Sequence, residues 1–151
     1  MSWDEAFADR YDEWSAHMTA DVAFYLELAR QADGPLVELG IGTGRVAIPV
    51  AQATGKPVIG IDSSPAMLQQ ARDRAAEAGV QLDLREGDMQ SLVLDTPAAL
   101  IYWPLSRAAA PANLGRSSAH LRACRRLAAR GRALCLEYRR LRPPDRRATR
   151  R

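Results

Sequence analysis

The stretch VELGIGTGRVAIPVA, residues 37–51, constrains the fold of this chain more than any other segment. It reads as an apolar strand, a loop that contains Gly40, Gly42 and Gly44, and the start of a helix. Glycine has no Cβ atom, so a ligand can approach the backbone of such a loop closely. This order predicts an open α/β sheet that binds a ligand beyond the carboxyl end of the strand.

Strand and helix patterns alternate along the chain. Four strands are expected, at residues 36–39, 58–62, 80–88 and 98–103. Helices are expected at residues 3–32, 44–54 and 65–78. Ser64 is a suitable N-cap for the last helix, Pro65 fits its first position and Gly79 ends it, whereas Pro49 should kink the second helix slightly. The order predicts an α/β fold with a doubly wound, mostly parallel sheet.

Three carboxylates lie at or near the carboxyl ends of the predicted strands, namely Glu38, Asp62 and Asp88. A dinucleotide site would have glycine at position 45, where this chain has Arg45, and Glu38 would repel a pyrophosphate. A cationic cofactor without phosphates suits the acidic rim better. S-adenosylmethionine, with its ammonium and sulfonium groups, is such a cofactor, and its ribose diol suits a carboxylate at the end of the second strand.

At this point the sequence resembles the class I S-adenosylmethionine-dependent methyltransferases of the small-molecule type. VELGIGTGRVAIPVA is similar to their first motif, VIGIDSSPAMLQQAR to the region of the second strand, and REGDM to the acidic stretch after the third. The three segments follow the family's order and spacing over residues 36–103. A glycine loop alone is often just a tight turn, but the three segments together indicate a cofactor site.

The resemblance implies residues at the methionine end of the cofactor. The three glycines would line the methionine part, with Glu38 near its amino group. Tyr102 and Trp103 would leave the fourth strand beside the methyl donor. Tyr11 resembles the N-terminal tyrosine that closes over the cofactor in small-molecule members, although Tyr11 and Trp14 could instead pack the N-terminal helix.

The resemblance also implies residues at the adenosine end. Asp62 would accept hydrogen bonds from both ribose hydroxyls, and Ser63 and Met67 would flank the adenosine. Met67 could equally be a core residue. Asp88 would face the adenine amino group, with the backbone of Met89 beside it.

The remaining features favour a cytoplasmic enzyme that acts on a small molecule. No Ser-His-Asp set or metal cluster is recognisable, and no catalytic residue is assigned, because methyl transfer is an in-line displacement driven largely by proximity and orientation. The acidic start MSWDEAFADRYDEW lacks the pattern of a signal peptide, no apolar run approaches roughly 20 residues, and two cysteines suit a reducing compartment. The expected partner is a small-molecule methyl acceptor, and neither nucleic acid nor a membrane.

The residues after Trp103 differ sharply from those before it. Residues 1–103 carry 16 Asp and Glu against seven Lys and Arg, whereas residues 104–151 carry 14 Arg and two acidic residues. We therefore divide the chain into N-terminal helices with an S-adenosylmethionine-binding α/β core, 1–103, and an Arg- and Ala-rich tail, 104–151. The tail could bind nucleic acid, could form a shortened ending with a degenerate helix and a fifth strand at ALCLEY, residues 133–138, or could be the family's ending read in a shifted frame.

We favour the shifted frame, because Arg, Ala, Pro and Gly have GC-rich codons and the change in composition is abrupt. An incomplete sheet would leave the fourth strand at or near an edge, where self-association is favoured. It would also impair methyl transfer unless ALCLEY pairs as a strand. The alternative function is a non-catalytic cofactor-binding fragment or an Arg-tailed nucleic-acid-binding module.

If the frame has shifted, the gene holds a family-like ending in another frame. Sequencing codons 95–151 and translating all three frames is expected to show that a single-base shift near codon 104 restores this ending. A gene in which no such shift restores it contradicts the hypothesis.

Overall fold

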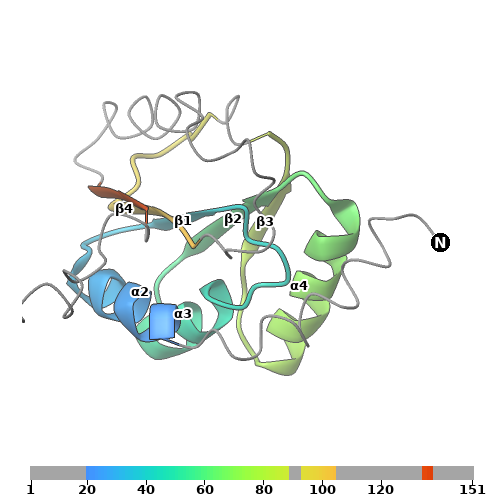
Figure 1. Cartoon of the computed structure of the whole chain (residues 1–151), viewed down its shortest axis with the longest axis horizontal. Helices are drawn as coiled ribbons and strands as arrows, with labels where there is room; N and C mark the ends of the chain where they lie inside the picture. The colour runs from blue at the N-terminus through green and yellow to red at the C-terminus, as the bar shows by residue number, and fades with distance from the viewer. Residues whose placement is uncertain (1–19, 89–92, 105–133, 138–151) are drawn as a thin grey trace, which may run out of the picture.

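The computed structural model describes residues 20–88, 93–104 and 134–137. Within these residues the elements, in chain order, are α2 (Ala20–Gln31), β1 (Leu36–Leu39), α3 (Ala47–Thr54), β2 (Val58–Asp62), α4 (Pro65–Glu77), β3 (Asp83–Glu86), β4 (Leu100–Trp103) and β5 (Leu134–Glu137) (Figure 1). The strands pair in parallel in the order β3-β2-β1-β4-β5. The predicted α/β fold with a parallel sheet is thereby confirmed.

Strand β1 lies in the centre of the sheet, and the chain changes direction beside it. From β1 the strands run outward through β2 to β3, and the chain then returns to place β4 on the other side of β1. Ligands of open α/β sheets bind at such a switch point, beyond the carboxyl ends of the strands. The register pairs Glu38 of β1 with Gly60 of β2 and with Tyr102 of β4, so these three residues lie in one row across the sheet.

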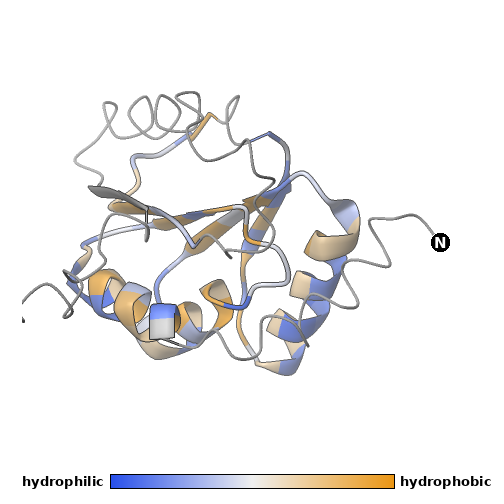
Figure 2. Ribbon diagram, viewed as in Figure 1, coloured by the Kyte–Doolittle hydropathy of each residue, from blue (hydrophilic) through white to orange (hydrophobic). Residues whose placement is uncertain are grey.

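The described helices cover one face of the sheet (Figure 1). On that side, Tyr25 and Ala29 of α2 and Val50 of α3 belong to one apolar cluster with Leu36 and Leu100 of the strands. On the other face the buried cluster consists of Val37, Leu39, Ile59, Ile61, Ala98 and Ile101. The central strands are hydrophobic and the outer side of α4 is hydrophilic (Figure 2). Burial on both faces explains why β1 and β2 are nearly continuous apolar runs.

The predicted caps of α4 are confirmed. Ser64 accepts a hydrogen bond from the Met67 backbone N–H at 3.2 Å, and Pro65 is the first helical residue. Gly79 follows the helix with a left-handed φ of 69°. Because Val80 then donates to the Ala75 carbonyl at 2.9 Å, it completes the end of the helix and is not the first residue of a strand.

The largest differences from the predicted bounds are in β3, β4 and α3. β3 is limited to Asp83–Glu86, partly because residue 80 belongs to the helix end, and β4 starts at Leu100 rather than at 98. α3 begins at Ala47 rather than at 44, which puts Pro49 in its first turn. A missing N–H has little effect there, so the reason for expecting a kink disappears. The part of the first predicted helix that precedes residue 20 lies outside the described residues.

The segment ALCLEY contains β5, which pairs with β4 along Leu100–Trp103. A strand thus lies where the sequence offered one, and β4 is second from this side of the described sheet. That this strand belongs to a shortened form of the family's ending stays a prediction. The degenerate helix expected earlier in the tail lies outside the described residues. The division of the chain after residue 103 stays a prediction.

Lys56, just before β2, fastens the C-terminal end of α2. Its Nζ donates to the carbonyl oxygens of Ala29, Arg30 and Ala32 at 2.6, 3.0 and 2.5 Å. The last carbonyls of a helix have no partner within it, and a cation is favourable at this negative end of the helix dipole. The contact therefore fixes where α2 ends on the sheet.

Gly60 makes room for the chain that leaves β1. A Cβ at this position would lie 2.1 Å from Ile41 Cδ1 and 3.1 Å from Leu84 Cδ2. The Ile41 N–H donates to the Ile61 carbonyl at 2.9 Å, and the Ile41 side chain is buried. The start of the glycine loop thus packs in the space that a side chain at position 60 would fill.

Replacing Gly60→Ala should lower the free energy of unfolding by about 1–3 kcal/mol, because the new methyl group overpacks against Ile41. Urea denaturation measures this, with Gly87→Ala as the matched control, since a Cβ at Gly87 meets nothing within 4 Å. In an Ile41→Val background, which lacks the clashing Cδ1 atom, Gly60→Ala should be less destabilising. Equal losses in both backgrounds would show that Ile41 is not the cause.

Candidate functional site

The loop between β1 and α3 depends on its three glycines. Gly40, Gly42 and Gly44 have φ angles of 65°, 57° and 83°, all in the left-handed region. In the part of the chain that the structure describes, no residue other than glycine has a positive φ. At Gly44 a Cβ would in addition lie 2.9 Å from Ile48 Cδ1. Side chains would therefore strain this backbone.

Asp62, at the end of β2, holds the glycine loop in place. Its Oδ2 accepts a hydrogen bond from the Gly42 N–H at 2.8 Å, and its Oδ1 accepts one from the Ser64 N–H at 3.0 Å. A carboxylate has about four acceptor positions, so capacity for further donors remains. The contact with ribose hydroxyls that the resemblance implies for Asp62 stays a prediction.

Glu38 is a buried carboxyl group in the central strand, with 2% of its surface exposed. Burial raises the pKa of Glu38 to about 8, and the nearby charges of Asp21 and Asp62 act in the same direction. The neighbouring Tyr102 hydroxyl and the Arg45 guanidinium favour the carboxylate and oppose this rise. Tyr102 is nevertheless not positioned for a good hydrogen bond, and Glu38 Oε2 has no such partner among the described residues.

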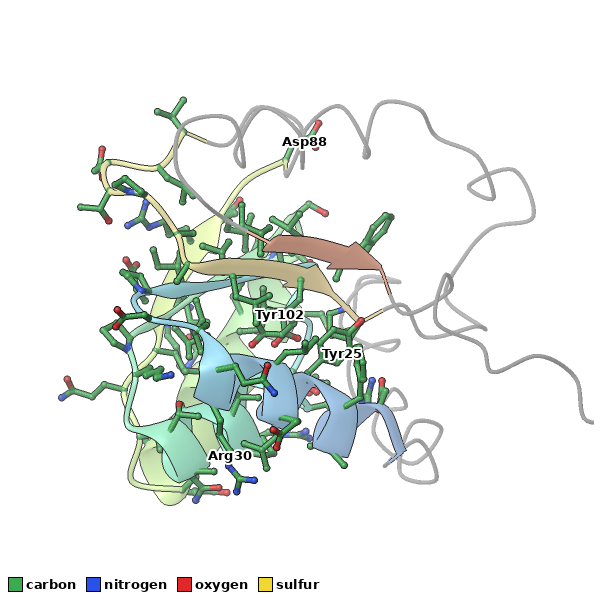
Figure 3. The ribbon with its side chains drawn as sticks, turned by 90° about the vertical axis from the view of Figure 1, so that its left-hand side faces the viewer. Tyr25, Arg30, Asp88 and Tyr102 are labelled. Carbon is green, nitrogen blue, oxygen red and sulfur yellow. The ribbon has the colours of Figure 1, made fainter. Side chains whose placement is uncertain are left out.

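Tyr102 lies next to Glu38 on β4 and is fully buried. Its ring stacks on Tyr25 of α2, with centroids 5.1 Å apart and an angle of 30° (Figure 3). The Tyr25 hydroxyl donates to the Trp103 carbonyl at 3.2 Å, whereas the Tyr102 hydroxyl has no hydrogen-bond partner among the described residues. Burial raises the pKa of Tyr102 well above its ordinary value, so its hydroxyl keeps its proton and can donate a hydrogen bond to a ligand.

Sequence reasoning missed an ion pair that joins α2 to the end of the glycine loop. Arg45 Nη1 and Nη2 donate to Asp21 Oδ1 and Oδ2, each at 2.7 Å, and the two side chains are 15% and 9% exposed. Nothing in the sequence marks Asp21 as the partner of Arg45, because an acidic residue in the first turn of a helix is common. Arg45 was considered only as the residue that replaces a glycine.

The other predicted cofactor residues lie near the ends of β2 and β3. Ser63 is exposed directly after β2, and Met67 is buried in the first turn of α4. Asp88 is exposed after β3, and it lies well apart from the Tyr25–Tyr102 pair (Figure 3). Tyr11 and Met89 lie outside the described residues. The structure therefore brings Glu38, the glycine loop, Asp62 and Tyr102 together, and their contacts with a cofactor stay predictions.

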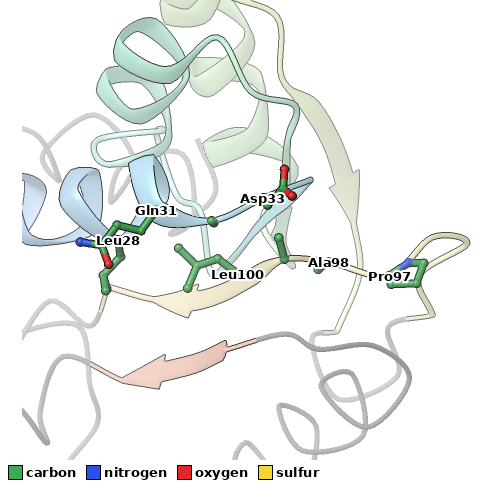
Figure 4. A pocket seen from close by; sticks show the side chains of 8 residues that line it. Leu28, Gln31, Asp33, Pro97, Ala98 and Leu100 are labelled. Atoms are coloured by element: carbon green, nitrogen blue, oxygen red, sulfur yellow. The ribbon is translucent and has the colours of Figure 1, made fainter.

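A pocket of about 560 Å³ opens near the amino ends of β1 and β4, opposite the ends that carry the glycine loop. It lies between the end of α2 and the start of β4, and its lining includes Leu28, Gln31, Asp33, Pro97, Ala98 and Leu100 (Figure 4). Because these residues flank the amino ends of the strands, the pocket is separate from the glycine loop. Within the described residues, no helix is long and apolar enough to cross a bilayer, and no group of three metal-ligating side chains is found.

A family model described as a methyltransferase domain matches residues 36–131. The chain belongs to this family. The class I S-adenosylmethionine-dependent methyltransferase that the sequence resembled is thereby confirmed, and S-adenosylmethionine is the cofactor of the family.

Known methyltransferases resemble parts of this chain. Indolepyruvate C-methyltransferase of Streptomyces griseus is 35% identical over 68 residues, which is 43% of this chain and 21% of that protein. The match thus spans about a fifth of the length of that relative. A protein of Methanococcus maripaludis, assigned as an S-adenosyl-L-methionine-dependent methyltransferase, shares the fold, with a TM-score of 0.65 and 20% identity over 84% of this chain and 60% of its own.

A third resemblance is to a methyltransferase solved with the demethylated cofactor. This protein of Thiobacillus denitrificans, in complex with S-adenosyl-L-homocysteine, has a TM-score of 0.50 and 26% identity over 58% of this chain and 37% of its own. Glu38 Oε2 and the Tyr102 hydroxyl are buried without a hydrogen-bond partner among the described residues, so the donors and acceptors of the present site fit such a cofactor.

The protonation of Glu38 should make the stability of the protein depend on pH. Unfolded, Glu38 ionises near its ordinary value of 4.5, whereas burial in the folded protein raises its pKa to about 8. Between these values the folded protein binds a proton that the unfolded chain has released, so this contribution to stability is lost as pH rises from about 5 to about 8.

Urea denaturation of the wild type and Glu38→Gln at several pH values between about 5 and 8 tests this. The Gln variant carries no such proton, so the wild type should lose stability relative to it by up to about 1.4 kcal/mol per pH unit. Parallel pH profiles for the two proteins would show that Glu38 is ionised in the folded state throughout this range.

Proposed function

We propose that this protein transfers a methyl group from S-adenosylmethionine to a small-molecule acceptor. The observation that carries the proposal is the glycine loop folded onto Asp62, with the buried carboxyl group of Glu38 beside it. Membership of the methyltransferase family supports it. The whole activity is a proposal, because the match covers about a fifth of the relative from Streptomyces griseus.

For this reaction the protein mainly has to bind the cofactor and the acceptor and to orient them relative to each other. S-adenosylmethionine supplies a methyl group on a positively charged sulfur, which an electron pair of the acceptor displaces in line. The products are the methylated acceptor, S-adenosylhomocysteine and a proton. The gain from holding two reactants in a near-attack geometry is large, so this reaction needs no nucleophile from the protein.

In this proposal each cluster of residues has one task. The glycine loop admits the methionine part of the cofactor, and Asp62 accepts from the ribose hydroxyls. Glu38 pairs with the ammonium group, whose positive charge favours the carboxylate over the protonated form that burial favours. Ser63, Met67 and Asp88 hold the adenosine, and Tyr102 borders the methyl group. Tyr11 and the backbone of Met89 complete the set, although both lie outside the described residues.

The resemblance to indolepyruvate C-methyltransferase suggests which acceptors to test first. Indolepyruvate is a small 2-oxo acid, and the carbon beside its carbonyl group becomes nucleophilic on loss of a proton. We therefore propose small 2-oxo acids as the first class of acceptor.

Binding of the demethylated cofactor tests the proposal directly. S-adenosylhomocysteine at millimolar concentration should raise the melting temperature of the wild type, because a ligand that binds the folded state alone stabilises it. Asp62→Ala should bind this ligand at least about tenfold more weakly by calorimetry, since it lacks the acceptor for the ribose hydroxyls and the anchor of the loop.

Asp95→Ala is the matched control, because this carboxylate is 87% exposed and its ion pair is with Arg85 of β3 rather than with the glycine loop. A wild type that shows no thermal shift with S-adenosylhomocysteine contradicts the proposed function. Methylation of indolepyruvate, followed by mass spectrometry, then decides the acceptor class. Binding without methylated product rejects 2-oxo acids of this kind as acceptors.

A further inference from the structure

Arg45 directly follows the glycine loop, and its charge reaches the carboxyl group of Glu38. Burial is the main cause of the raised pKa of Glu38, which the charge of Arg45 lowers and the charges of Asp21 and Asp62 raise further. The guanidinium is nevertheless turned towards Asp21, with which it forms a two-point ion pair. Glu38 Oε2 meanwhile has no hydrogen-bond partner among the described residues.

The geometry of the ion pair restricts the guanidinium strongly. Two parallel, charge-assisted hydrogen bonds define the plane of the group as well as its position. Both side chains are largely buried, so water competes weakly for them. The orientation of Arg45 is therefore set from α2, an element that contributes no other predicted cofactor residue.

Without Asp21, the guanidinium would have a strong alternative partner. Arginine pairs readily with carboxylates in sites that exclude water, and Glu38 Oε2 is buried without a hydrogen-bond partner among the described residues. An Arg45–Glu38 pair would neutralise the acidic group and place a cation where the ammonium group of the cofactor is proposed to bind. Two cations do not share such a position.

We infer that Asp21 is a positioning residue for the cofactor: its ion pair holds the Arg45 guanidinium away from Glu38 and leaves that carboxyl group to the ammonium of S-adenosylmethionine. This inference rests on the proposed function. A simpler explanation is that the pair merely joins α2 to the end of the glycine loop. The two explanations differ when one partner is removed. If the pair only links the two segments, loss of Asp21 and loss of Arg45 should weaken ligand binding equally.

Calorimetry with two ligands and three variants separates these explanations. S-adenosylhomocysteine carries the ammonium group, whereas 5′-methylthioadenosine has the same adenosine part without it. Asp21→Asn should weaken binding of S-adenosylhomocysteine about tenfold or more and change binding of methylthioadenosine by no more than about twofold. Arg45→Met, which has no charge to occupy Glu38, should keep the wild-type affinity for both ligands within about twofold.

The double variant Asp21→Asn/Arg45→Met should recover the affinity for S-adenosylhomocysteine. Asp73→Asn, an exposed carboxylate of α4, is the control for the loss of a negative charge. Circular dichroism confirms that each variant is folded. Equal weakening of both ligands by Asp21→Asn, or equal weakening by Asp21→Asn and Arg45→Met, would assign the pair a structural role alone.

An Asp21→Asn variant with wild-type affinity for S-adenosylhomocysteine also overturns the inference. If the wild type itself binds neither ligand, the proposed function fails first and the inference fails with it. The pattern among the variants decides the role of Asp21, and the wild type decides the function, so the two failures are distinguishable.

Discussion

The two hydrogen bonds that the Asp62 carboxylate accepts connect three parts of the fold. One comes from the middle of the glycine loop, and the other comes from the residue that caps α4. A single side chain at the end of β2 thus sets both the path of the chain after β1 and the start of α4. The left-handed backbone at Gly42 is possible because a glycine stands there and because its N–H has this acceptor.

Two ionisable side chains, Glu38 and Tyr102, lie where the sheet is most deeply buried. β1 is paired on both sides, and its one polar residue, Glu38, points to the face that the helices cover. Burying such a group without a full set of hydrogen bonds is unfavourable, and natural proteins accept such arrangements mainly at functional sites. The same row holds the fully buried Tyr102, whose hydroxyl also lacks a partner among the described residues. This pattern supports the proposed role of the cluster in cofactor binding, which stays a prediction.

Local sequence signals predicted the elements well, because their causes are local. The cap at Ser64, the helix end at Gly79 and the buried strands follow from side chains within a few positions of each feature. The extent of β3 was harder to predict, because residue 80 is used by the preceding helix end. The strand at ALCLEY was offered as one alternative, and its pairing with β4 depends on tertiary contact.

The polar contacts of the site were predictable only in part. The glycines and Asp62 belong to a recognisable spacing, so their position at the switch point could be expected. The partnership of Asp21 with Arg45 joins a helix to the end of a loop 24 positions away, and neither residue type nor spacing indicates it. The raised pKa of Glu38 likewise arises from burial, a property of the assembled sheet.

The contact of Lys56 with the last carbonyls of α2 acquires a further meaning beside Asp21. An acidic side chain lies at the positive end of this helix and an ammonium group lies at its negative end. Both charges oppose the dipole of the helix, which reduces its field along the apolar face that covers β1 and β4. At the buried carboxyl group the field of the α2 backbone is therefore reduced, and the charged side chains Asp21, Arg45 and Asp62 are left to act on Glu38.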